Sequence, residues 1–410
     1  MTKIVIIGAG FAGLKAALEL EKRYKKDKSV SVTLIDKHDY HLYSPSLYEV
    51  AASEEEFSSI SQLEKSVVLP LPQLLSGKRI NFIQGEASFV DQRQKKVKVG
   101  IREIGYDYLV LAAGSGPEFY NIPGAQQHGL PLKNLTEAFR IRNALEFAVQ
   151  SHTQDAIKQY IRFVVAGGGH TGVELAGEMS KLADILAWKY NYPREKIEIV
   201  ILESSNQLIP DFNSQESKEV VGRLLDLGVE IKILSLIFKV TGQLVELLDG
   251  ERIHYDVLVW TAGVRAANVP SSLPWPCDRR GHLQVDGVLR VKGFDNIFAI
   301  GDIADTKSNR GLRMATTAQA GMAEAKFLAQ SLPKLLQNKK PREFAYTPHP
   351  FVVSVGGKWA LVKFQQRYLS GYIGYLVRLA ADFRYYSSLI GWVKALKYTL
   401  FRAEIFGRND

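Results

Sequence analysis

The chain has 410 residues, which at roughly 150 residues per domain is enough for two or three domains, and its composition is 46% hydrophobic and 23% charged. These values are those of an ordinary globular protein and exclude disordered, collagen-like and coiled-coil classes. The formal net charge is +9, and one cysteine, Cys277, excludes a disulfide framework, a cysteine-based zinc or iron–sulfur site and a two-thiol redox mechanism.

The sequence contains no run of about 18 uncharged apolar residues, so we expect no membrane-spanning helix. The apolar run near the start is too short for a secretory signal. We therefore expect a reducing, cytoplasmic compartment.

The first 36 residues follow the pattern of a dinucleotide-binding unit. The expected elements are a buried strand (Ile4–Ile7), a glycine loop (Gly8–Gly13), a helix (Leu14–Arg23) and a second strand (Val30–Ile35). Gly8 permits a tight turn, Gly10 lets backbone approach a pyrophosphate, and Gly13 lets the helix pack closely on the strand. The helix N-terminus attracts phosphate, and Asp36 at the tip of the second strand can accept hydrogen bonds from a ribose.

The same unit occurs a second time, 159 residues later. Its expected elements are a strand (162–166), a glycine loop (Gly167–Gly172), a helix (173–190) and a second strand (197–202) that ends at Glu203. The strand and small-residue turn at 106–114 are likewise repeated at 255–263. One glycine loop is weak evidence, but two complete units predict two nucleotide sites.

A buried strand that ends in Gly301-Asp302 indicates which nucleotide binds where. In flavoproteins with two nucleotide sites, such a strand returns to the first domain, and its aspartate meets the ribityl chain of FAD. We therefore assign FAD to the first unit and the nicotinamide nucleotide to the second. The expected parts are an FAD domain in two segments (1–120 and 265–340), an inserted NADH domain (121–264) and a C-terminal region (341–410).

The acidic residues of the second unit concern the nicotinamide nucleotide. Glu203 at the strand tip favours NADH, because a carboxylate binds the 2′-hydroxyl and repels the 2′-phosphate of NADPH. The alternative is that Glu203 points to solvent. Glu174 and Glu178 either complement the helix dipole or, in the case of Glu174, face the nicotinamide and flavin. We interpret His170 as a loop residue rather than a catalyst.

With these motifs the chain resembles the type II NADH:quinone oxidoreductases. These are single-subunit, non-proton-pumping FAD enzymes of the pyridine nucleotide–disulfide reductase superfamily. The resemblance covers nearly the whole chain. It is carried by the segments Gly8–Gly13, Tyr40–Ala51, Gly169–Glu178, Trp260–Val264 and Gly301–Asp302.

The family motif AQxAxQ, which lies over the flavin and opens to the quinone, corresponds here to the segment Ala318–Ala323. Ala318 and Gln319 match the motif, whereas Gly321 replaces its central alanine and Ala323 its second glutamine. The second change removes a hydrogen-bond donor to a quinone carbonyl, which leaves the type of quinone open.

The resemblance implies site residues that fall into three groups. The residues expected to bind FAD non-covalently are Gly8, Gly10, Phe11, Ala12, Gly13, Asp36, Lys37, Ala87, Ala113, Gly114, Gly301, Asp302, Ala318 and Gln319. Those expected to bind NADH are Gly167, Gly169, His170, Thr171, Gly172, Glu174, Glu203 and Gly263, with Glu174 as the catalytic residue. Those expected at the quinone are Gln319, Met322 and Ala323, and no metal site is expected.

The last 55 residues are basic and aromatic, with nine bases against three acids. We predict a helix over Tyr385–Arg402, in which Leu389, Val393, Leu396 and Leu400 form one apolar stripe. Such a helix could pack on the protein or serve dimerisation. Nucleic-acid binding is not favoured, since no recognised module is present. The charge and the resemblance favour an anchor to an anionic membrane surface.

The expected fold class is therefore α/β, with two doubly wound, Rossmann-like domains, the second inserted in the first, and a C-terminal α+β membrane-associating region. The expected reaction is transfer of two electrons from NADH through FAD to a membrane quinone, by a peripheral protein on the cytoplasmic face of the membrane. A homodimer is possible. The alternatives are an NADH reductase of a soluble acceptor and a non-enzymatic flavoprotein that responds to NADH.

Overall fold

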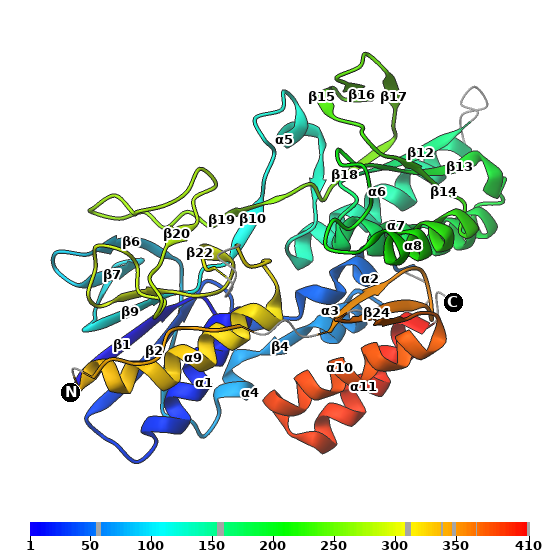
Figure 1. Ribbon diagram of the computed structural model, residues 1–410. Helices are drawn as coiled ribbons and strands as arrows, with labels where there is room; N and C mark the ends of the chain where they lie inside the picture. Colours follow the sequence, from blue (N-terminus) through cyan, green and yellow to red (C-terminus); the bar gives the residue numbers. More distant parts are fainter. Residues whose placement is uncertain are drawn as a thin grey trace. The chain divides into compact units, whose positions relative to one another are not determined.

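The computed structural model describes residues 1–54, 59–153, 160–307, 313–337, 339–346, 350–365 and 367–407. The chain divides into two compact units (Figure 1). Unit 1 comprises Met1–Leu42, Val68–Gly116 and Val264–His349. Unit 2 comprises Tyr43–Val67, Pro117–Gly263 and Pro350–Asp410. The main part of unit 2 is therefore an insertion between two segments of unit 1.

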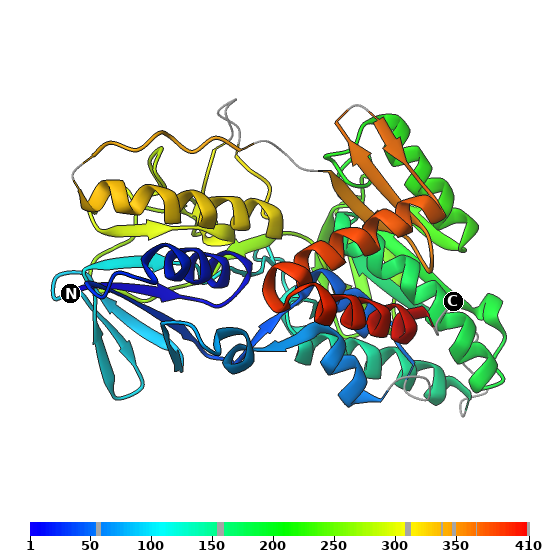
Figure 2. The same ribbon diagram turned by 90° about the horizontal axis from the view of Figure 1, so that it is seen from below.

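Unit 1 is built on a parallel sheet with the strand order β21-β9-β1-β2-β5. Its strands are β1 (Thr2–Ile7), β2 (Val30–Asp36), β5 (Ile80–Gln84), β9 (Tyr108–Leu111) and β21 (Ile297–Ala299). The central strand β1 is a run of Ile and Val that is buried over its last four residues, as expected of a parallel strand covered on both faces. Helices α1 (Phe11–Tyr24) and α9 (Ala318–Leu336) lie side by side in this unit (Figures 1 and 2).

The rest of unit 1 consists of short elements around this sheet. An antiparallel sheet is formed by β6 (Ala87–Asp91), β7 (Lys96–Val99) and β8 (Arg102–Gly105). The other elements are β3 (Tyr40–Leu42) paired with β4 (Val68–Pro70), β20 (Leu283–Gln284) paired with β22 (Ala304–Asp305), the helix α4 (Leu71–Leu75) and the 3₁₀ turn η3 (Gly301–Ile303). The strands β10 (Ser115–Pro117) and β19 (Val264–Ala266) pair where the chain passes from one unit to the other.

Unit 2 repeats the parallel sheet, with the order β11-β18-β12-β13-β14. Its strands are β11 (Leu130–Pro131), β12 (Ile161–Ala166), β13 (Ile197–Leu202), β14 (Val229–Lys232) and β18 (Val257–Trp260). Its main helices are α6 (Leu135–Thr153), α7 (His170–Lys189) and α8 (Ser214–Asp226). Smaller elements are α5 (Ala125–His128), η2 (Arg194–Lys196) and the antiparallel strands β15 (Ile237–Val240), β16 (Leu244–Leu247) and β17 (Arg252–His254).

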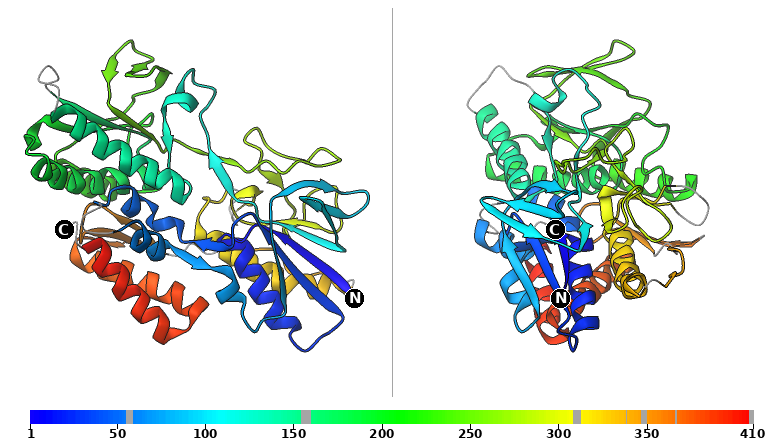
Figure 3. Two further views of the ribbon diagram at one scale, coloured as in Figure 1. Left: turned by 180° about the vertical axis from the view of Figure 1, so that it is seen from behind. Right: turned by 90° about the vertical axis from the view of Figure 1, so that its left-hand side faces the viewer.

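Two distant segments of sequence complete unit 2. The first contains η1 (Ser44–Ser46), α2 (Leu47–Ala51) and α3 (Ile60–Val67). The second contains the antiparallel strands β23 (Phe351–Ser354), β24 (Ala360–Phe364) and β25 (Arg367–Leu369), followed by α10 (Tyr372–Ile390) and α11 (Trp392–Phe406). We call α10 and α11 the C-terminal helix pair; they pack against each other as a hairpin (Figure 3).

The expected α/β fold class is confirmed, including the repeated Rossmann-like unit and the C-terminal strands and helices. In three respects the structure differs from the expectations. Residues 43–67 belong to unit 2 rather than to a continuous N-terminal segment, and the C-terminal region is part of unit 2 rather than separate. The single helix predicted over Tyr385–Arg402 is wrong, because Gly391, with φ 78°, ends α10 and starts α11.

Helix α7 and the turn after β23 approach each other closely at Gly177. A Cβ atom on Gly177 would lie 2.6 Å from the backbone nitrogen of Gly356 and 3.0 Å from the carbonyl carbon of Val355. Both neighbours are backbone atoms, which cannot rotate away. The absence of a side chain at Gly177 therefore allows the C-terminal strands to pack on α7.

We expect Gly177→Ala to lower the free energy of unfolding by roughly 1–3 kcal/mol, because the added methyl group overpacks this contact. Gly222→Ala in α8 is the matched control: a Cβ there meets nothing within 4 Å. That control should gain up to about 1 kcal/mol from helix propensity. Denaturant unfolding of both variants checks this, and equal stabilities would contradict the close contact.

A buried carboxyl joins α9 to the end of β21 in unit 1. Glu324, which is 3% exposed, accepts a hydrogen bond of 2.5 Å from the backbone N–H of Gly301. Burial raises the pKa of Glu324 to about 7, against the opposing effect of that hydrogen bond. Glu324 thus fixes the turn that carries Asp302.

We expect Glu324→Gln to remove part of the pH dependence of stability. In the wild type, the unfolded chain releases this proton near pH 4.5, whereas the folded protein keeps it until about pH 7. The free energy of unfolding therefore falls as pH rises through this window and stays lower above it. The glutamine keeps an acceptor oxygen for Gly301 but cannot ionise, so the difference in stability between about pH 5 and about pH 8 should shrink. Unfolding curves measure this difference, and an unchanged difference, equal to that of the exposed control Glu86→Gln, would contradict the assignment.

Candidate functional site

The carboxyl edge of the unit 1 sheet gathers the residues expected to bind FAD. The segments that follow β1, β2, β9 and β21 all leave this edge, because these strands are parallel. Gly8, with φ 103°, turns directly after β1, and a Cβ on it would lie 2.2 Å from the carbonyl oxygen of Ala112. A Cβ on Gly13 would lie 1.8 Å from the carbonyl oxygen of Gly8. Only glycine fits at these two positions.

The loop between these glycines leaves room for a phosphate. Gly10 is the N-cap of α1, and a Cβ on it would meet nothing within 4 Å. No side chain caps α1, and no acidic residue lies in its first turn. By contrast, Thr317 caps α9 through a hydrogen bond of 3.2 Å from the N–H of Ala320. Helix α1 therefore presents uncapped amide groups beside open space, which fits the pyrophosphate of a dinucleotide.

Two acids stand at the same edge. Asp36 accepts hydrogen bonds from the N–H groups of Ala9 (2.6 Å) and His38 (2.8 Å), so it lies directly against the glycine loop. Asp302 accepts a hydrogen bond of 2.7 Å from the hydroxyl of Ser115. These carboxylates keep further lone pairs for ribose or ribityl hydroxyls.

The remaining expected FAD residues are less uniform in position. Ala113 and Gly114 follow β9 directly and are half-buried. Lys37 is exposed just beyond β2, and Ala87 lies at the start of β6, shortly after the end of β5. Phe11 and Ala12 begin α1.

The segment that resembles AQxAxQ forms the first turns of α9. Gln319 is exposed, while Met322 and Ala323 are half-buried. Gly321 is buried against α1: a Cβ there would lie 3.2 Å from the Cβ of Ala12 and 3.3 Å from the Cα of Gly301. The glycine that replaces the central alanine therefore serves close packing of α9.

Unit 2 contains the second glycine loop in the same geometry. Gly167, with φ 110°, turns directly after β12, and a Cβ on it would lie 2.8 Å from the Cα of Ala262. A Cβ on Gly172 would lie 1.9 Å from the carbonyl oxygen of Gly167. Gly169 is the N-cap of α7, has open space around it, and no side chain caps this helix. Thr171 is exposed in the first turn. This loop also fits a pyrophosphate.

Glu203 follows β13 and is turned back on this loop. Its Oε2 accepts a hydrogen bond of 2.6 Å from the N–H of Gly168, and its Oε1 accepts one of 2.7 Å from the N–H of Ser205. The side chain does not point to solvent, since Glu203 is only 8% exposed. Gly168, which is not among the expected site residues, is packed tightly: a Cβ there would lie 2.4 Å from Leu208.

Two more positions border the second loop. Gly263, with φ 80°, follows β18, and a Cβ on it would lie 2.1 Å from the hydroxyl oxygen of Tyr120. Tyr120 was not expected here. The ring of His170 stacks on Phe351 with 5.5 Å between ring centroids, and burial lowers its pKa. A neutral, stacked ring agrees with the interpretation that His170 is a packing residue rather than a catalyst.

Glu174 lies one turn beyond the loop, in the second turn of α7, because the helix begins at His170. Its Oε1 accepts a hydrogen bond of 3.3 Å from the N–H of Ser354 in β23. Loss of hydration, partly offset by Arg378, raises the pKa of Glu174 to about 8. The carboxyl therefore holds a proton at neutral pH. Glu178, one turn further on, accepts a hydrogen bond of 3.1 Å from the N–H of Gly357.

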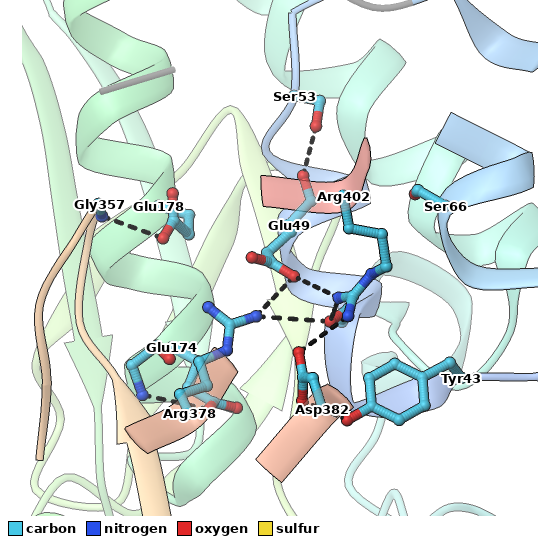
Figure 4. A network of polar contacts seen from close by, with 12 residues as sticks. Tyr43, Glu49, Ser53, Ser66, Glu174, Glu178, Gly357, Arg378, Asp382 and Arg402 are labelled. Carbon is cyan, nitrogen blue, oxygen red and sulfur yellow. Dashed lines mark hydrogen bonds and ion pairs between the residues drawn. The ribbon is translucent and has the colours of Figure 1, made fainter. Parts of the chain in front are cut away.

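A buried group of charges lies near Glu174 and was not foreseen (Figure 4). We call Glu49, Arg378, Asp382 and Arg402 the arginine cluster. Oε2 of Glu49 lies 2.7 Å from Arg378 and 3.3 Å from Arg402. Arg402 lies 2.8 Å from Asp382, which also accepts a hydrogen bond of 2.5 Å from the Tyr43 hydroxyl. Each of the four charged residues is at most 9% exposed.

The arginine cluster corrects the interpretation of the basic tail. Arg378 and Arg402 do not form part of an exposed basic surface, since both are buried in ion pairs. The large apolar side chains of the C-terminal helix pair are instead the exposed ones: Tyr372, Ile373, Leu376, Trp392, Val393, Leu396 and Leu400. An i, i+4 spacing of Gly374, Arg378, Asp382 and Tyr386 was the available signal, but charged residues at that spacing normally face water.

Two further observations concern metal ions and membranes. Within the described residues, no group of histidine, cysteine or acidic side chains is arranged to hold a metal ion. In the same part of the chain, no helix combines the length and apolarity needed to cross a bilayer.

Comparison with known proteins identifies the family. Residues 2–323 match the family model of the pyridine nucleotide-disulphide oxidoreductases. A type II NADH:quinone oxidoreductase of Staphylococcus aureus is 29% identical over 361 residues, which cover 86% of this chain and 87% of that protein.

Solved structures share the fold at lower sequence identity. NDH2 from Plasmodium falciparum, in complex with NADH, matches with a TM-score of 0.86 and 19% identity over 99% of both chains. The sulfide:quinone oxidoreductase of Aquifex aeolicus matches with a TM-score of 0.74 and 18% identity, over 93% of this chain and 90% of that one. The expected resemblance and cofactors are thereby confirmed. The chain belongs to the pyridine nucleotide-disulphide oxidoreductase family and is an NADH-driven flavoprotein oxidoreductase that uses FAD.

Proposed function

We propose that this protein transfers two electrons from NADH through FAD to a membrane quinone, without pumping protons, as a peripheral protein on the cytoplasmic face of the membrane. The observation that carries the proposal is the pair of uncapped glycine loops, one in each unit, in a chain similar to a type II NADH:quinone oxidoreductase. FAD, when bound, would supply the electron transfer itself, by accepting hydride from NADH and releasing electrons to the acceptor.

The chain's own residues would hold the two nucleotides. In unit 1, the α1 amides would bind the FAD pyrophosphate, while Asp36 and Asp302 would hold its ribose and ribityl hydroxyls. In unit 2, the α7 amides would bind the NADH pyrophosphate. Glu203 would accept from the 2′-hydroxyl of NADH and repel the 2′-phosphate of NADPH.

Glu174 is the proposed catalytic residue. Reduction of a quinone to a quinol takes up two protons along with two electrons. A carboxyl whose pKa lies at about 8 is protonated at neutral pH and can give up its proton when negative charge develops nearby. Gln319, exposed at the start of α9, is the proposed contact to the quinone, together with Met322 and Ala323.

The decisive experiment for this function follows the flavin spectrum under anaerobic conditions. The FAD-loaded protein should bleach on addition of NADH, and a short-chain quinone should restore its colour. Bleaching that only a ferredoxin or another soluble protein reverses would favour a soluble acceptor instead. Bleaching that no acceptor reverses would favour a non-enzymatic NADH-responsive flavoprotein, and a protein unable to retain FAD would contradict the proposal entirely.

The C-terminal helix pair is the proposed contact with an anionic membrane. Its outward side chains include Ile373, Trp392 and Leu400, which are 61%, 70% and 62% exposed. The exposed bases Lys394 and Lys397 lie on the same pair. Exposed apolar and aromatic groups beside cations are suited to the headgroup layer of an anionic bilayer.

We expect the double variant Trp392→Ser, Leu400→Ser to bind vesicles containing anionic lipid more weakly, because it removes apolar area from this face. Leu225→Ser is the control, since Leu225 is a 57% exposed leucine on α8 of the same unit. Vesicle sedimentation measures both. Equal loss of binding in the two variants, or no loss in either, would count against this surface.

A further inference from the structure

The C-terminal helix pair buries Arg378, Asp382 and Arg402 and exposes many of its large apolar side chains. Arg402 lies 2.8 Å from Asp382 and 3.3 Å from Glu49, and it also donates a hydrogen bond to the hydroxyl of Ser46. Its guanidinium lies over the rings of Tyr43 and Tyr386, at 5.0 and 5.4 Å from their centroids. These contacts hold both terminal nitrogens of the Arg402 guanidinium in one position.

Glu49 is shared between two arginines that come from different helices. The same oxygen, Oε2, contacts Arg378 of α10 and Arg402 of α11 (Figure 4). When Arg402 neutralises part of the charge on Glu49, Arg378 is held less strongly by Glu49. The positive charge of Arg378 then remains available to stabilise the negative charge of other carboxylates nearby.

One of those carboxylates is Glu174 of α7, whose pKa Arg378 lowers. Glu49 lies on α2, which packs against α7, the helix that carries Glu174 and Glu178. The groups that interact with the Glu174 carboxyl are Tyr48 and Glu49 of α2, Glu178 of α7, the N–H of Ser354 in β23, and Arg378 of α10. Among these groups, Arg378 alone carries positive charge.

From this arrangement we propose that Arg402 is a positioning residue, which acts through Glu49 and Arg378 to set the charge around Glu174 without touching it. Its importance for turnover rests on the proposed function, in which Glu174 supplies a proton. The effect of Arg402 on the protonation of Glu174 does not rest on that function, because it exists in the resting protein.

The sign of the effect differs between the two partners of the ion pair. Loss of the positive charge at Arg402 leaves Glu49 paired to Arg378 alone, so Arg378 offsets Glu174 less and Glu174 holds its proton to higher pH. Loss of the negative charge at Asp382 leaves Arg402 paired with Glu49 alone, so Arg402 neutralises more of the charge on Glu49 and Glu174 releases its proton at lower pH. A merely structural disturbance of the helix pair would shift both variants in the same direction.

The experiment is infrared titration of the FAD-loaded protein, with no NADH or quinone present. The C=O stretch of protonated Glu174 is identified as the band that disappears in Glu174→Gln. The pH at which this band reaches half intensity should rise in Arg402→Gln and fall in Asp382→Asn. It should shift less in Arg402→Lys than in Arg402→Gln, because lysine restores the charge.

Lys394→Gln is the matched control, since it removes one positive charge from an exposed position of the same helix. It should leave the half-intensity pH unchanged. If Arg402→Gln does not fold, the Asp382→Asn and Arg402→Lys titrations still decide the question. Shifts in the same direction for Arg402→Gln and Asp382→Asn, or no shift in Asp382→Asn, would overturn the inference. Absence of quinone reduction would leave these titrations unaffected and would bear on the proposed function alone.

Discussion

In each unit, the start of one helix is pressed against the end of one strand so tightly that no side chain can stand between them. The hypothetical Cβ atoms of Gly13 and Gly172 lie 1.8 and 1.9 Å from the carbonyl oxygens of Gly8 and Gly167. This contact aims the first amide groups of α1 and α7 at the loop and leaves open space beside Gly10 and Gly169. Both nucleotide sites follow from it, because a phosphate needs just such converging, unsatisfied amides. The rest of each sheet holds this junction in place.

The sequence was sufficient to predict what depends on local spacing. The glycine loops, the strands that precede them, and the acids at Asp36 and Glu203 occupy the expected places because each depends on neighbours within a few tens of residues. The periodicity of apolar residues was a poorer predictor in the C-terminal region, where Gly391 divides one expected helix in two. An apolar stripe records which residues share a face, but it does not record whether the chain turns between them.

The arginine cluster could not be predicted, for a different physical reason. Glu49 lies 353 residues from Arg402 in the sequence. Nothing in the spacing of a charged residue distinguishes a buried ion pair from a solvated side chain. Charged residues are also rarely buried, so the reasonable default assigns them to the surface. The helix pair departs from this default: Arg378, Asp382 and Arg402 are buried, while Leu376, Leu396 and Leu400 are exposed. Such burial is tolerated because each charge has a partner, and removal of one partner from a buried pair typically costs about 3–5 kcal/mol.

The acids at the two strand tips have an effect that extends beyond recognition of a ribose. Asp36 accepts the N–H of Ala9, and Glu203 accepts the N–H of Gly168, so each carboxylate already fastens the middle of its own glycine loop. A flexible loop of this kind would otherwise lose conformational entropy whenever a ligand arrived. Here that ordering is completed when the chain folds. An arriving dinucleotide therefore meets a rigid receptor, and more of its intrinsic interaction energy is retained as affinity.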